Sequence, residues 1–220
     1  MKNALGLYFK IAILLAASSC NGQTQPDSGI KNQTNARVGG PCDTCELMYV
    51  GMPQSIDATD TSKAWSGDGD KLVLTGTVYR SDQKTPAPDI LLYYWQTNED
   101  GLYADKQGLN PDVKRHGYIR GWVKTDRQGK YTIYTIRPAP YPNNTMPAHV
   151  HMLVKEPTLA NEYYIDDVVF EDDPLLTSQE RNQFNNIGGS SIVKPRLLHD
   201  VQYVNRDIIL GLNVKDYPEQ

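Results

Sequence analysis

Hydrophobic and polar side chains alternate along much of the chain with the two-residue period of β-strands. The clearest alternation covers residues 130–136, and residues 71–79 repeat it with many β-branched side chains. Residues 90–95 are instead continuously apolar, which is typical of a strand that is buried on both faces. We interpret the aromatic run Tyr93, Tyr94 and Trp95 within them as core. Further strands are predicted at residues 119–124, around 149–151, at 163–170 and at 207–213.

Helical periodicity is almost absent beyond the first twenty residues. One short helix is predicted within residues 176–186, and residues 104–117 form a long polar loop of the kind that usually carries function. The 17 glycines and 14 prolines place turns between the strands. These patterns predict an all-β fold, an antiparallel or mixed β-sandwich with long loops and little helix.

The N-terminus has a separate character. Lys2 and Lys10 flank its basic start, an apolar run follows, and small residues lead to Cys20. The run is too short to span a bilayer and is typical of an export signal. The residues before Cys20 resemble a bacterial lipobox, although Ala17 stands where leucine is favoured. We therefore expect a signal peptide at 1–19, with Cys20 lipidated. The lipid would anchor the protein to the bacterial cell envelope, at the outer membrane or its periplasmic face; plain secretion is the alternative.

Residues 20–38 are polar and predict a flexible tether ahead of one domain at 39–220. Cys42 and Cys45 form a C-x-x-C pair just inside that domain. The pair could be half of a zinc site or a redox dithiol, but no second pair completes a four-cysteine site, and the βαβ context of a thioredoxin-like motif is missing. An oxidising envelope favours a structural disulfide between Cys42 and Cys45.

The charge balance argues against one class of partner. The net charge is −4, and no cluster of lysine and arginine predicts a nucleic-acid groove. With 39% hydrophobic and 22% charged residues, the composition is that of an ordinary globular domain. The sequence favours neither a monomer nor an oligomer.

His149 and His151 are the strongest candidates for chemistry. On a strand, alternate side chains share a face, so the two imidazoles project together from Cα atoms roughly 6–7 Å apart. Such a pair can chelate a metal ion. Zinc would require a further histidine, cysteine or carboxylate, and non-haem Fe(II) a carboxylate. Tyr141, eight residues before His149 in a proline-rich turn, offers a phenolate that a hard trivalent cation can stabilise.

Residues 72–174 resemble the intradiol ring-cleavage dioxygenases, the family of catechol and protocatechuate dioxygenases. The motifs that carry the resemblance are Pro88-Asp89, Trp95-Gln96, Asn98-Glu99-Asp100-Gly101-Leu102-Tyr103, Ile119-Arg120-Gly121-Trp122, Thr125-Asp126, Gly129-Lys130-Tyr131, residues 135–142, Pro147-Ala148-His149-Val150-His151 and residues 170–174. The resemblance implies the family's β-sandwich and a non-haem Fe(III) ion. Its ligands would be Tyr103, Tyr141, His149 and His151.

The resemblance also implies the reaction. A small catecholic substrate would bind the ferric ion, displace Tyr141 and pass a proton to it, and O2 would then cleave the ring to a muconate-type dicarboxylate. One position departs from the family pattern, because Met146 stands where an arginine usually stabilises the activated ring. Arg120 is our candidate replacement, with Arg115 and Arg137 as alternatives, although each could be an ordinary surface charge.

Two other interpretations remain at this stage. The strand pattern also resembles transthyretin-like modules, which bind sugars or proteins without catalysis. An intradiol relative could also keep iron and lose ring cleavage, as Met146 would allow. Of the remaining histidines, His116 could line the mouth of the pocket or be structural, and His199 is expected to be structural or exposed.

Overall fold

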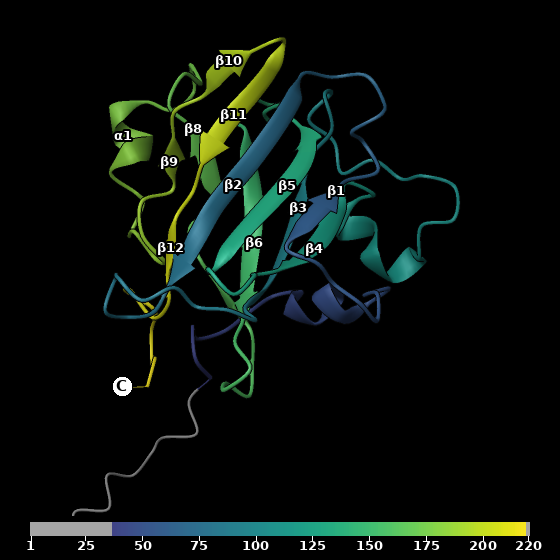
Figure 1. Ribbon diagram of the computed structural model, residues 1–220. Coiled ribbons are helices and arrows are strands. Elements are labelled where there is room, and N and C mark those ends of the chain that lie inside the picture. The colour runs from purple at the N-terminus through teal and green to yellow at the C-terminus, as the bar shows by residue number, and fades with distance from the viewer. Residues whose placement is uncertain (1–36, 219–220) are drawn as a thin grey trace, which may run out of the picture. The chain divides into compact units, whose positions relative to one another are not determined.

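A computed structural model describes residues 37–218, which form twelve strands in two mixed sheets with only short helical turns (Figure 1). The predicted all-β sandwich is confirmed. The predicted signal peptide, Cys20 and most of the predicted tether lie outside the described residues. Within residues 37–218, no helix has the length and apolar character needed to cross a bilayer.

The first sheet is built on the two longest alternating strands. Its order is β1 (Thr59–Thr61), β5 (Lys130–Ile136), β2 (Lys71–Tyr79), β11 (Val201–Asn205) and β10 (Arg196–Leu198), with β12 (Ile208–Ile209) also paired to β2. β2 and β5 are antiparallel, with Leu74 opposite Ile133. The side chains that alternate inward from these strands form one wall of the core.

The second sheet carries the residues of chemical interest. Its order is β4 (Arg120–Lys124), β3 (Leu91–Gln96), β6 (His149–Lys155), β8 (Val168–Phe170) and β9 (Ile192–Val193), with β7 (Tyr163–Tyr164) also paired to β6. Trp95 on β3 lies opposite Arg120 on one side and His151 on the other. Directly opposed residues share a face, so these three side chains emerge from the same side of the sheet.

The two faces of the second sheet have different neighbours. One face supplies Leu92, Tyr94, Val150 and Met152 to the core between the sheets, where they pack with buried side chains of the first sheet. The opposite face carries Tyr93, Trp95 and Leu153, which pack with Cys45 and Met48. The strand at 91–96 is therefore buried on both faces, in agreement with its continuous apolar run.

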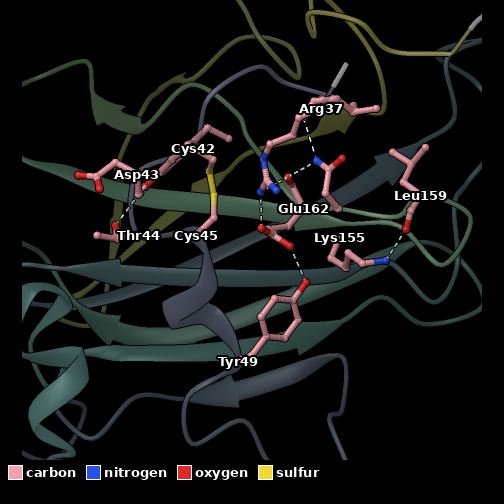
Figure 2. A network of polar contacts seen from close by, with 12 residues as sticks. Arg37, Cys42, Asp43, Thr44, Cys45, Tyr49, Lys155, Leu159 and Glu162 are labelled. Atoms are coloured by element: carbon pink, nitrogen blue, oxygen red, sulfur yellow. Dashed lines mark hydrogen bonds and ion pairs between the residues drawn. A yellow bond between two sulfur atoms is a disulfide. The ribbon is translucent and has the colours of Figure 1, made fainter. Parts of the chain in front are cut away.

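Residues 37–58, here called the N-terminal strap, cover part of that outer face and include the 3-10 helix η1 (Cys45–Tyr49). Figure 2 shows how the strap is held. The Arg37 guanidinium and the Tyr49 hydroxyl both donate to the carboxylate of Glu162, and Tyr164 Oη donates to Asp43 O at 2.9 Å. A disulfide joins Cys42 to Cys45, the first residue of η1. Trp122 Nε1 donates to Met48 O at 2.6 Å from the neighbouring sheet.

The structure differs from the predicted elements in several places. The single strand predicted at 163–170 is divided into β7 and β8, because the Asp166 carboxylate accepts a hydrogen bond from Ile187 N and turns the chain between them. Residues 207–213 contain only β12, and the pairing of β10 with β11 was not predicted. The predicted helix is the four-residue α1 (Ser178–Arg181), and the polar loop contains a 3-10 helix, η2 (Pro111–His116).

The core between the sheets predicts a large effect of truncation at Leu92, which is completely buried. Leu92→Ala should lower the free energy of unfolding by about 2–5 kcal/mol, because it removes apolar contacts and leaves a cavity. Leu197→Ala is the control, since Leu197 is 71% exposed, and it should change stability by less than about 0.5 kcal/mol. Urea denaturation of both variants measures the difference. Equal losses of unfolding free energy in the two variants would contradict this placement of the core.

Candidate metal centre

His149 and His151 stand at the start of β6, on the outer face of the second sheet. Val150 between them points into the core between the sheets, as strand alternation requires. Tyr103 lies on the segment that connects β3 to β4, and Tyr141 lies on the loop that connects β5 to β6. Two loops and one strand therefore deliver the four side chains to the same face.

Hydrogen bonds to backbone groups join the two loops that carry the tyrosines. Ala139 N donates to Asn98 O at 3.1 Å, and Thr97 Oγ1 donates to Ala139 O at 2.7 Å. Gly101 lies so close to the second loop that a Cβ atom there would stand 2.0 Å from Pro140 O. Its φ of +76° is also one that glycine adopts without strain. The glycine thus lets the turn before Tyr103 pack against the segment that leads to Tyr141.

The side chain of Asn98 sets the direction of the first loop. Its Oδ1 accepts hydrogen bonds from Asp100 N at 3.1 Å and from Leu102 N at 2.9 Å. An asparagine that bonds to backbone two to four residues ahead fixes a tight turn. The turn ends directly before Tyr103, so the ring of this tyrosine is directed by a hydrogen-bonded segment.

Four donor atoms meet at one point. Tyr103 Oη lies 2.8 Å from Tyr141 Oη and 2.7 Å from His151 Nε2. His149 Nε2 lies 3.2 Å from both Tyr141 Oη and His151 Nε2. Two ligands at right angles on one ion, with bonds of about 2.1 Å, stand about 3 Å apart. The spacing of the four atoms therefore fits a shared metal ion.

Each histidine is oriented by a bond on its other ring nitrogen. His149 Nδ1 lies 2.8 Å from Pro147 O, and a carbonyl oxygen can only accept, so Nδ1 carries the proton and Nε2 is free to ligate. His151 Nδ1 lies 2.9 Å from Asp167 Oδ1. A carboxylate or carbonyl behind a ligating histidine is the usual way in which proteins fix its tautomer and direction.

Asp167 is the residue that sequence reasoning missed. It could also be taken as a ligand, since His149, His151 and Asp167 each offer a donor atom within 4.8 Å of the others. Its carboxylate, however, bonds to Nδ1 of His151, whereas the tyrosine oxygens meet the Nε2 atoms of both histidines. The carboxylate therefore stands behind His151, and the phenols stand in front of both rings. We assign Asp167 an orienting position.

The electrostatics of the cluster depend on burial. Burial, followed by the hydrogen bond to Tyr141, raises the pKa of the Tyr103 phenol far above its usual value. Burial and the neighbouring His151 lower the pKa of His149. Burial alone would raise the pKa of Asp167, but the charge and the hydrogen bond of His151 hold it below its usual value. His149 can thus offer a neutral nitrogen, whereas phenolate formation at Tyr103 requires a strong cationic charge nearby.

The three arginines considered as replacements for the missing cation all have other partners. Arg120 donates from Nε to Tyr93 Oη at 2.6 Å and from Nη2 to two carbonyls of the strap, Leu47 O and Val50 O. Arg115 pairs with Asp43 at 2.9 Å, and Arg137 pairs with Asp172 at 2.7 Å. None of them joins the four-atom cluster.

Arg120 also lines a cavity of about 370 Å3 beside β4 and the strap, together with Asp60 and Trp122. None of the four clustered side chains lines that cavity. The size of this cavity does not make it the active site, because the convergent donor atoms lie elsewhere and a reaction requires those atoms more than it requires volume. The position of Arg120 fits a structural role, in which it fastens the strap to the sheet.

His116 does not line a pocket mouth. It is 2% exposed and lies between Tyr93 Oη, 2.8 Å from its Nδ1, and Thr44 Oγ1, 3.1 Å from its Nε2. Its ring stacks on Trp95, which in turn stacks on His151 at 4.6 Å. The aromatic core of the outer face thus forms the wall behind one clustered histidine. His199 is exposed in the turn between β10 and β11.

The chain is similar to known proteins in both sequence and fold. Residues 49–210 match the family model described as "Dioxygenase". The chain is 27% identical over 143 residues to catechol 1,2-dioxygenase of Acinetobacter baylyi, covering 57% of this chain and 43% of that protein. It is 33% identical over 114 residues to chlorocatechol 1,2-dioxygenase of Pseudomonas sp. strain P51, covering 43% of each. The chain therefore spans less than half of the length of these relatives.

The fold has relatives of known structure as well. Wild-type catechol 1,2-dioxygenase from Acinetobacter radioresistens superimposes with a TM-score of 0.55 at 17% identity. The match covers 84% of this chain and 64% of that one. At this identity, the similarity shows a shared fold.

The environment of His116 predicts a pH dependence of stability. Burial, followed by the charge of Arg120, lowers its pKa to about 3, whereas the unfolded chain titrates near 6.5. Below pH ~6.5 the unfolded state therefore binds the extra proton first. Above that pH, neutral His116 makes its full contribution to the free energy of unfolding. This contribution declines as the pH falls toward the pKa of His116 in the folded state, by up to about 1.4 kcal/mol per pH unit.

Denaturation between pH 7 and 4.5 measures this effect. The free energy of unfolding of His116→Gln should fall less steeply than that of the wild type, and His199→Gln should follow the wild type. Parallel curves for all three proteins would show that His116 titrates normally.

Proposed function

The chain belongs to the intradiol dioxygenase family, and on that basis we propose that it is an Fe(III)-dependent enzyme that cleaves a catecholic compound with O2. Ring opening between the two hydroxyl-bearing carbons would give a muconate-type dicarboxylate. The observation that carries the proposal is the convergence of two phenol oxygens and two imidazole nitrogens at 2.7–3.2 Å. Among metal ions, this mixed donor set suits a hard trivalent cation that stabilises phenolate.

Tyr103, Tyr141, His149 and His151 would hold the ion. A bound ferric ion would supply Lewis acidity, which draws electron density from a bound catecholate and directs O2 to the ring. The chain supplies the geometry. Pro147 O and Asp167 keep both Nε2 atoms directed inward, and Trp95 supports the ring of His151. Such preorganised positions avoid reorganisation during the reaction.

Tyr141 is the ligand that we assign to proton transfer. Its Oη is 3.2 Å from the histidine nitrogen that it contacts, His149 Nε2. Tyr103 Oη is closer to its own histidine, at 2.7 Å from His151 Nε2, and the two phenol oxygens are 2.8 Å apart. The residues that follow Tyr141, 142–146, are exposed, so its loop has a solvent side along which it can move. Tyr103, whose Oη lies 2.7 Å from His151 Nε2, would stay in place while Tyr141 Oη moves away and accepts a proton from the substrate hydroxyl.

A second function is favoured by one position. Met146 stands where the family pattern has an arginine, and Arg115, Arg120 and Arg137 have other partners. A protein that binds iron and catechol with little ring cleavage is therefore the alternative. A non-catalytic transthyretin-like module is not favoured, because it gives no reason for the convergence of the four donors.

The iron content and the visible spectrum of the protein test the proposal. Aerobic reconstitution with iron should give about one ion per chain and a visible phenolate-to-iron charge-transfer band. Tyr141→Phe removes one phenolate and should shift or abolish the band. Tyr134→Phe is the matched control, because Tyr134 lies on β5 of the other sheet, and it should leave the spectrum unchanged. A colourless protein without iron would exclude the proposed centre.

Oxygen uptake separates the two functions. An active enzyme should consume one O2 per catechol, whereas the alternative predicts a spectral shift on catechol binding without oxygen consumption. Met146→Arg should then raise the rate if the missing cation limits the reaction; a single lost electrostatic contact of this kind costs roughly 10²–10³ in kcat.

A further inference from the structure

A small cavity of about 110 Å3 adjoins the four-donor cluster on the β8 side. His149 of the cluster lines it together with Asp167, which orients His151, and with Val169, which lies directly opposite His149 across the β6–β8 pairing. Its remaining lining residues are Met146, Pro147, Glu180, Gln183 and Phe184. For comparison, a dry engineered cavity of about 150 Å3 holds benzene. The space thus suits part of an aromatic ring or its substituent.

Most of the cavity wall is apolar. Met146, Pro147, Val169 and Phe184 offer no charge; the first two precede β6, Val169 lies on β8 and Phe184 follows α1. Such a wall favours a flat or aliphatic group by removing its surface from water. It does not by itself distinguish one catechol from another.

The charged groups of the cavity all have one sign. Asp167 and Glu180, the latter from α1, both line it, and no lysine or arginine is among its lining residues. The nearby cations on this side are bonded elsewhere. Arg181 Nη2 donates to Glu171 O at 3.1 Å, and Arg137 pairs with Asp172. An anionic group bound here would be repelled by the two carboxylates, and a cationic group would be attracted by them, although Asp167 also bonds to His151 and Glu180 also accepts from Gln183.

We propose that this cavity selects the ring substituent by charge, so that the protein takes catechols with cationic or neutral side chains and rejects catechols that carry a carboxylate. Glu180 is the specificity-determining residue, and Met146 contributes by placing an apolar group where a cation would attract anions. The inference rests on the proposed function, because it assumes that the ring binds at the adjoining metal centre.

Binding measurements under argon test the selection without turnover. The ferric protein is titrated with 3,4-dihydroxybenzylamine, 4-methylcatechol and 3,4-dihydroxybenzoate, and the shift of the charge-transfer band gives each Kd. The amine should bind roughly 3- to 10-fold more tightly than the carboxylate, as expected for partly exposed charges. For each variant, the Kd values of the amine and the carboxylate are divided by the Kd of the neutral 4-methylcatechol.

Two variants assign the effect to residues. Glu180→Gln should reduce the amine-to-carboxylate preference roughly 2- to 5-fold. Glu46→Gln makes the same charge change on the exposed side of η1, outside the cavity, and should leave the preference as it is. Met146→Arg should reverse the order, so that the carboxylate binds more tightly. Thermal unfolding of each variant checks that it folds.

The outcomes distinguish the two proposals. If the ferric band forms and 4-methylcatechol binds but the charge preference is absent, or Glu46→Gln changes it as much as Glu180→Gln, the charge selection is wrong and the proposed function stands. If no iron binds, the proposed function fails, and binding in the cavity is followed in metal-free protein by the Met146 methyl NMR signal. Benzylamine should then shift that signal at lower concentration than benzoate; equal responses would overturn the selection.

Discussion

The position of β6 between β3 and β8 is the constraint on which the site depends. Antiparallel pairing places Trp95 beside His151 on one side and Val169 beside His149 on the other. Two residues further along the β6–β8 pair, Asp167 comes opposite His151. Asp167 Oδ1 lies 2.9 Å from His151 Nδ1. A shift by one residue would turn every one of these side chains to the opposite face. The buried row Val150 and Met152 prevents that shift, because these side chains would leave the core between the sheets and the two imidazoles would enter it.

The tyrosines depend on a second constraint, the contact between two loops. Thr97, Asn98 and Gly101 bind or touch the segment of Ala139 and Pro140, so that neither tyrosine is placed independently. Holding four polar groups together costs desolvation, which the hydrogen bonds among them only partly offset. Burial raises the pKa of Tyr103 and lowers that of His149, so the metal-free cluster is poor at holding charge. A strongly charged cation would reverse this.

Alternation predicted the shared face of His149 and His151, and turn residues predicted most of the strands between 71 and 155. Tyr103 could be chosen among 14 tyrosines only through resemblance to a family, because its contact with Tyr141 spans 38 residues and arises from loop packing. Asp167 escaped prediction because its role depends on the register of β8, and no turn residue such as glycine or proline marks the division of 163–170. The contacts of Arg120 were not predicted for a related reason: two of its partners are backbone carbonyls of the strap, which leave no signature in the side-chain pattern, and the third is Tyr93 Oη.

Crystals grown with iron and measured on both sides of the iron absorption edge would test the central claim most directly. The account predicts one anomalous peak per chain, about 2.0–2.2 Å from Tyr103 Oη, Tyr141 Oη, His149 Nε2 and His151 Nε2, with the Asp167 carboxylate bonded to His151 Nδ1 and not to the metal. A peak bound by Asp167 with the two histidines, and without either tyrosine, would contradict it.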